Sequence, residues 1–77
     1  MPRYFFDLSN HHLSPDTTGV ELPSADEARK QAIVLAGACL KDDPSLVDGG
    51  QTMQVRVRDD AGTTFFSVAT RSQDVKG

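Results

Sequence analysis

Two adjacent histidines are the first residues whose type and spacing suggest chemistry. His11 and His12, with Asp7 and Asp16 on either side, offer imidazole and carboxylate groups of the kind that bind metal ions. Adjacent histidines on a loop point in different directions, and the sequence around them shows no framework to orient the ligands. We therefore predict no metal site here.

The nucleophilic residues are equally isolated. Cys39, the single cysteine, has no histidine near it in the sequence and ends an apolar helical stripe, as a packing residue does. Ser67 and Ser72 have no partner base nearby, and Gly49-Gly50 is followed by neither a lysine nor a helix start, so it is not a phosphate loop. We expect no catalytic residue and no cofactor.

Composition limits the remaining possibilities. The chain has 77 residues, 38% of them hydrophobic, which suffices for one small domain with a marginal core and no disulfide. Self-association is one way for such a domain to gain stability. Eleven acidic and eight basic residues give a net charge of -3, which argues against tight, sequence-independent binding of nucleic acid. The first residues do not have the pattern of a signal peptide, so we expect a cytoplasmic protein.

The elements that must position any site begin with an aromatic strand. Residues 3–8 alternate between two faces, with Tyr4, Phe6 and Leu8 on the better core face and Arg3, Phe5 and Asp7 on the other. Residues 9–18 are rich in turn-forming types and predict a loop or irregular hairpin. A short extended piece is expected at 19–22.

A helix is expected from residue 24 onward. Ser24 and Glu27 form a capping box, and Pro44 ends the helix because it disfavours helical geometry at the residue before it. The predicted buried stripe comprises Ala25, Ala28, Ala32, Leu35, Ala36 and Cys39, with Ile33 and Leu40 on its margin. Val34 lies on the opposite side, where it is either a single exposed apolar residue or a partner contact.

Residues 53–58 alternate strictly between apolar and polar types, and with residues 63–70 they predict a hairpin around a turn at 59–62. The expected fold is therefore α+β: one helix on a three- to four-stranded, mainly antiparallel sheet, in the order strand, short strand, helix, strand, strand. We expect one domain over residues 1–70, a polar tail at 71–77, and the first strand beside residues 63–70.

Three blocks of the sequence resemble a known family. The start MPRYFFD, the block GVELPSADEARKQA at residues 19–32 and the block VRVRDDAGTTFFSV at residues 55–68 together resemble a family of short bacterial proteins classed as a domain of unknown function. The resemblance spans nearly the whole chain and implies the same α+β domain. It brings no catalytic or binding residue with it.

The leading functional hypothesis is a non-enzymatic protein-interaction module that forms a homodimer. If Phe6 and Phe66 face the helix, alternation places Phe5 and Phe65 on the open sheet face, where they and Ala69 form an uncovered apolar patch. A two-fold partner would bury this patch. The alternatives are a different strand register, or a loop at 9–18 that folds over the face. Val34 offers a second contact surface.

A second hypothesis assigns the same face to single-stranded nucleic acid, or to an antitoxin-like regulatory role. Phe5 and Phe65 would stack on bases, and Arg56 and Arg58 would meet phosphates together with Arg3 and Gln54. The valine–arginine alternation is equally typical of a solvated strand.

A third hypothesis is an enzyme. Removal of Met1 would leave Pro2 at the amino terminus, and the element order is similar to that of small tautomerases, in which an amino-terminal proline is the general base. Arg3 and Arg56 could supply the cations that lower the pKa of such an amine. The helix begins later than in that family, after a long polar loop, so we expect a protein that is not an enzyme.

Overall fold

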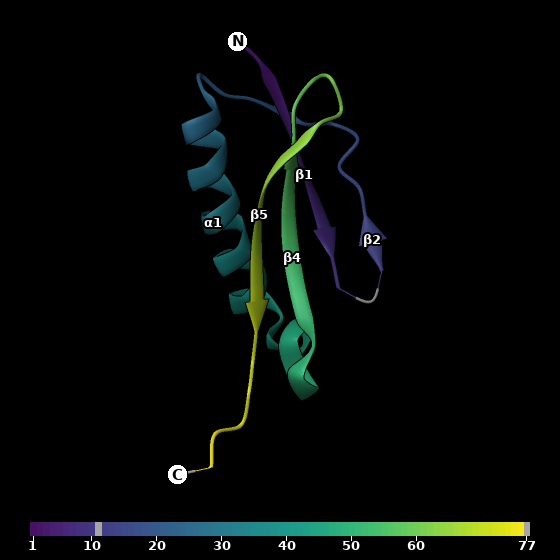
Figure 1. The fold of residues 1–77 in the computed structure, drawn as a ribbon, viewed down its shortest axis with the longest axis vertical. Helices are drawn as coiled ribbons and strands as arrows, with labels where there is room; N and C mark the ends of the chain where they lie inside the picture. Colours follow the sequence, from purple (N-terminus) through teal and green to yellow (C-terminus); the bar gives the residue numbers. More distant parts are fainter. Residues whose placement is uncertain (11, 77) are drawn as a thin grey trace.

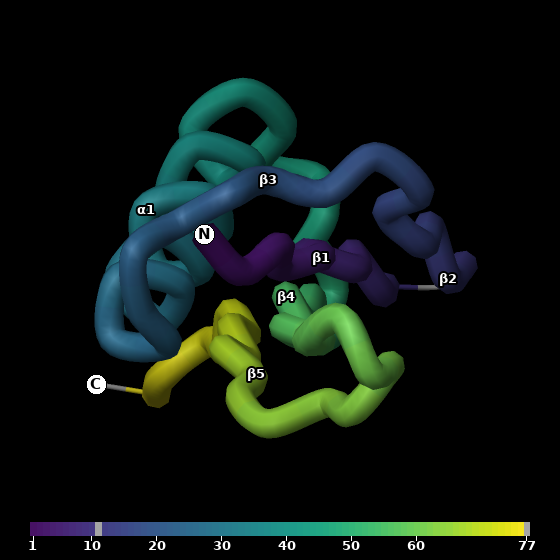
Figure 2. The backbone as a smooth tube through the Cα atoms, turned by 90° about the horizontal axis from the view of Figure 1, so that it is seen from above, coloured from purple at the N-terminus to yellow at the C-terminus, as the bar shows by residue number. Residues whose placement is uncertain are grey.

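The structure is a computed structural model that describes residues 1–10 and 12–76. It contains β1 (Arg3–Ser9), β2 (Leu13–Ser14), β3 (Val20–Glu21), helix α1 (Ala25–Asp42), the 3-10 segment η1 (Pro44–Gly50), β4 (Thr52–Arg58) and β5 (Thr64–Arg71). The strands form one sheet in the order β2-β1-β4-β5, and β3 pairs with the other half of the β1 edge. Helix α1 lies along one side of the sheet (Figures 1 and 2). The predicted α+β class is confirmed.

Helix α1 begins and ends where the sequence predicts. The hydroxyl of Ser24 accepts a hydrogen bond from the Glu27 amide at 3.3 Å, and the helix stops at Asp42, two residues before Pro44. The Glu27 carboxylate does not complete the expected box but lies 3.6 Å from Lys30 Nζ. The connector after the helix, for which no helical structure was predicted, contains η1.

The core lies between α1 and the two central strands. Its buried members are small on the helix and large on the sheet, so the helix approaches closely: Tyr4, Phe6, Ala28, Ala32, Ala36, Met53, Val55 and Val57. The predicted stripe is confirmed at its centre, whereas Ala25, Leu35 and Cys39 are half-buried and Ile33 is exposed. No helix within the described residues is long and apolar enough to cross a membrane.

One pairing expectation is wrong. β1 does not lie beside residues 63–70 but pairs with β4, and the two strands are antiparallel. The physical reason is that the chain reverses directly after β1, so that β2 and β3 both pair antiparallel to β1. The helix therefore runs in the same direction as β1, and β4 returns against it. β5, the strand rich in phenylalanine, is left at the edge of the sheet.

Candidate interaction surface

The expected aromatic pair on the open face does not form. Phe65 packs on the helix side, its ring 5.8 Å from that of Tyr4 in an edge-to-face arrangement, and Arg29 of α1 lies over both Phe65 and Phe66. The cause is a register shift opposite Val57 and Arg58, where β5 carries one extra residue. A bulge of this kind breaks strict alternation, so consecutive phenylalanines turn to the same side.

Phe5 is on the open face, as predicted, but it is covered. The Arg58 guanidinium carbon lies 4.8 Å from the centre of its ring, a cation–π distance. From the other side the loop between β2 and β3 closes over it: a Cβ added at Gly19 would stand 2.8 Å from Phe5 Cε2. The segment between β2 and β3 thus covers this part of the face, which agrees with the alternative in which the chain after β1 folds over it.

A polar network fixes that loop to the sheet. The carboxylate of Asp7 accepts two hydrogen bonds from Arg58, at 2.6 Å from Nε and 3.1 Å from Nη2, and a third from the Asp16 amide at 2.9 Å. Arg58 also donates to the Asp16 carbonyl at 2.8 Å. The Asp7 side chain is only 10% exposed and that of Arg58 is 28% exposed. Because these groups satisfy one another, Arg58 is a structural residue of this face.

The protonation of the network follows from these contacts. Hydrogen bonding from Arg58 lowers the pKa of Asp7 below its ordinary value, although burial acts in the opposite direction. Burial by itself raises the pKa of Asp16, but backbone N–H groups of the neighbouring chain donate to its carboxylate and lower it overall. Asp7 in turn raises the pKa of Arg58. All three groups are therefore charged near neutral pH.

Asp16 also closes one edge of the sheet. Its Oδ2 accepts from the Phe6 amide at 3.2 Å, at the gap between β2 and β3, and its Oδ1 accepts from the amides of Thr18 and Gly19. A side-chain carboxylate thus replaces a strand partner where neither short strand reaches. With two-residue strands, Pro15 and this carboxylate, the β1 edge is poorly suited to pairing with another chain.

Arg56 is the one predicted surface arginine that the structure leaves exposed on the open face. Its Nε donates to Gln54 Oε1 at 3.2 Å, along the same strand. Arg3, in contrast, donates to the Thr18 carbonyl and forms an ion pair with Glu21 at 3.1 Å. The basic side chains that were expected to act together are therefore divided between intrachain contacts and solvent.

The direction of the backbone groups of β1 can be read from its outer contacts. The Leu22 amide donates to the Pro2 carbonyl, and the Phe6 amide donates to Asp16, so even-numbered residues of β1 turn their backbone groups away from β4. In an antiparallel pair these directions alternate along each strand. Even-numbered residues of β4 therefore turn toward β1, and odd-numbered ones turn toward β5.

This alternation leaves the far side of β5 unpaired. The odd-numbered residues of β4 lie opposite Thr70, Val68 and Phe66. The backbone N–H and C=O groups of these three residues therefore point toward β4 and pair with it. The N–H and C=O groups of Ser67, Ala69 and Arg71 therefore point outward. Within the described residues, no strand pairs with that side. Apart from Arg71 the strand carries no charge, and it contains no proline.

Apolar residues of the helix are also exposed. Ile33 is 56% exposed and Val34 is 64% exposed. Ile33 follows Arg29 by one helical turn, so it lies on the side of α1 that faces β5. Val34, which we expected to be either a single exposed apolar residue or a partner contact, is exposed and projects about 100° further around the helix. Ile33 was missed because it was placed at the margin of the buried stripe.

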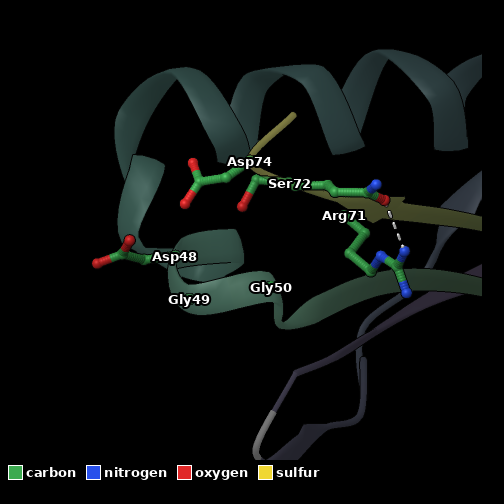
Figure 3. Close-up of a pocket in the computed structure, with 7 residues that line it drawn as sticks. Asp48, Gly49, Gly50, Arg71, Ser72 and Asp74 are labelled. Atoms are coloured by element: carbon green, nitrogen blue, oxygen red, sulfur yellow. Dashed lines mark hydrogen bonds between the residues drawn. The ribbon is translucent and has the colours of Figure 1, made fainter. Parts of the chain in front are cut away.

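A solvent-open pocket lies between η1 and the end of β5 with the segment that follows it. It has a volume of about 500 Å³ and is lined by Asp48, Gly49, Gly50, Arg71, Ser72, Gln73 and Asp74. Figure 3 shows Arg71 at one end, bonded to Gln73, while the carboxylates of Asp48 and Asp74 lie toward the other. The charged groups do not converge on one point, so the pocket does not define a reaction or an anion site.

A smaller pocket brings together two residues that the sequence separates. Cys39 and His12 both line a cavity of about 150 Å³ at the end of the sheet, with apolar walls from Leu8, Leu46 and Met53. Sequence distance had suggested no histidine near the cysteine. His11, the other half of the proposed metal pair, lies outside the described residues. Among the described residues, no group of three histidine, cysteine or acidic side chains is placed to hold a metal.

Pro2 is exposed at the end of β1. Its carbonyl accepts from the Leu22 amide at 3.1 Å, which fixes the residue to the segment just after β3. Neither of the two pockets described above includes it.

Comparison with known proteins identifies the family. Residues 3–71 match the family described as Domain of unknown function (DUF6894), and the chain belongs to it. No curated protein and no solved structure matches the chain. The family assignment carries no activity with it.

Proposed function

We propose that this protein is a non-enzymatic protein-interaction module that self-associates, with the outer edge of β5 as its contact surface. The observation that carries the proposal is the contrast between the two edges of the sheet. The β1 edge is divided into short pieces and closed by Asp16, whereas β5 presents outward backbone groups at Ser67, Ala69 and Arg71. A long, unpaired edge with a single charged residue at its end is a suitable site for addition of a strand from another chain.

A protein partner fits this surface better than nucleic acid. Base stacking needs exposed rings, yet Phe65 packs against Tyr4 and Phe5 is covered by Arg58 and the loop at Gly19. Of the arginines proposed to meet phosphates, Arg58 is bound to Asp7. An unpaired strand, in contrast, offers main-chain donors and acceptors that another strand satisfies directly.

The test is the mass of the purified protein in solution, measured by light scattering over a concentration series. We expect a species with twice the 8.3 kDa chain mass, which dissociates into single chains only at the low end of the concentration series. The chain mass at every concentration would refute self-association. A trimer or hexamer would favour the tautomerase-like alternative, since those enzymes resemble ring assemblies.

A further inference from the structure

We propose that the partner of β5 is the β5 strand of a second copy, paired antiparallel across a two-fold axis at Val68. This inference rests on the self-association proposed above and specifies its geometry. The two sheets then join into one continuous sheet, with Val68 facing its own counterpart and Ser67 facing Ala69 of the second copy. The outward backbone groups of Ser67 and Ala69 each gain a partner in the pairing.

The direction of the backbone groups limits the register. Hydrogen-bonded pairs form only between residues that both point outward, and near the middle of the strand these are Ser67 and Ala69. Pairing them with each other places the axis at Val68 and uses the regular part of β5 beyond the bulge. Their small side chains lie on the open face and leave room for the second strand.

Charge favours a second copy. None of the eleven acidic residues lies between residues 61 and 73, so β5 itself brings no negative charge to the axis. The two Arg71 residues each lie three positions from Val68, so they are separated by about 20 Å along the paired strands. At that distance their repulsion is screened at physiological ionic strength.

The helix side of the same edge supplies apolar contact. A two-fold axis perpendicular to the sheet places both helices on one face of the joined sheet. Helix α1 packs against β4 and β5. A helix axis midway between these two strands lies about 5 Å from the two-fold symmetry axis, so the axes of the two helices are roughly 10 Å apart. Packed helices are separated by about 8–10 Å. Ile33 and the half-buried Phe66 then face the partner, which explains their exposure in the single chain.

A proline at position 69 tests the edge directly. Ala69→Pro removes an outward N–H and leaves the bonds between β4 and β5 intact, because proline is tolerated where the N–H of an edge strand faces solvent. Ala69→Val, which keeps the N–H, is the matched control. By light scattering we expect the proline variant to have the chain mass and the valine variant twice that mass, at a concentration where the parent is fully dimeric.

A cysteine pair tests the register and does not depend on the proline variant. In a Cys39→Ala background, Val68→Cys places two thiols at a close, non-hydrogen-bonded pair with Cα atoms about 4.5 Å apart, within disulfide range. Thr70→Cys is the control on the same face, with its two copies about 14 Å apart along the strands. We expect oxidation to cross-link most of the first variant and little of the second.

The outcomes separate the two proposals. A parent protein that is monomeric throughout refutes both self-association and the β5 pairing. A dimeric parent whose Ala69→Pro variant folds and stays dimeric, or whose Val68→Cys variant cross-links no faster than Thr70→Cys, refutes the β5 pairing and leaves self-association standing. If Ala69→Pro does not fold, the comparison of the two cysteine variants decides the question.

Discussion

The carboxylate of Asp7 allows the sharpest prediction about stability. Asp7→Asn conserves volume and keeps an oxygen that can accept from the Asp16 amide, but it removes the negative charge that Arg58 contacts at 2.6 and 3.1 Å. Hydrogen bonds to charged groups contribute about 1.5–3 kcal/mol each. Since part of the guanidinium can regain water, we expect the free energy of unfolding to fall by about 2 kcal/mol at neutral pH.

The pH dependence of this loss identifies its cause. The folded-state pKa of Asp7 lies below the ordinary value of 3.8, so its contribution to stability is present above that value and is lost as the pH falls through the folded pKa. The difference between parent and Asp7→Asn should therefore be full at neutral pH and shrink as the pH falls below 3.8. Asp16, whose charge raises the pKa of Asp7, itself has a lowered pKa and contributes to stability with the same sign.

The measurement is urea unfolding followed by far-UV circular dichroism, at one fixed protein concentration because association also stabilises the fold. Asp74→Asn, at an exposed position in the segment after β5, is the matched control and should unfold like the parent. A loss below about 0.5 kcal/mol at neutral pH, or a difference that stays constant on acidification, would refute the assignment of the network as a stabilising ion pair.

Three further changes follow from the structure, each measured by the same unfolding assay. Phe65→Ser should cost about 2 kcal/mol without altering the dimer mass, because the ring packs against Tyr4; a changed mass with unchanged stability would contradict this. Gly19→Ala should cost about 2 kcal/mol, since φ is +74° and the new Cβ would meet Phe5; a neutral substitution would show that the loop does not cover that ring. Ser24→Ala should cost about 1 kcal/mol through loss of the helix cap, and restoration by Ser24→Asp would support that cause.

The local elements could be predicted because each depends on nearby residues. The cap at Ser24 and the stop at Pro44 fix α1 through interactions within a few positions, and the strict alternation at residues 53–58 fixes β4. The α+β class follows from the order of such elements. For the same reason the core face of β1, with Tyr4 and Phe6, was placed correctly.

The residues that lie exposed on the open face of the sheet could not be predicted from alternation alone. A single extra residue opposite Val57 and Arg58 turned Phe65 to the helix side, and no local pattern marks that bulge. The coverage of Phe5 required a loop whose anchor, Asp16, bonds to residues far away in the sequence. Strand alternation places Asp7 and Arg58 on the same open face of the sheet. Because opposite charges on one face can pair, this placement could have indicated the ion pair from the sequence.

The sequence by itself determined the helix, the strand segments and the core faces, because caps, prolines and apolar periodicity act through short-range geometry. Only the tertiary structure decided which strand lies at the edge. That outcome depends on the reversal of the chain directly after β1: β2 and β3 both run antiparallel to β1, α1 then runs in the direction of β1, and β4, not β5, returns as its antiparallel neighbour. Strand order depends on the direction in which each successive element runs, so a single short reversal early in the chain is enough to leave β5 at the edge of the sheet.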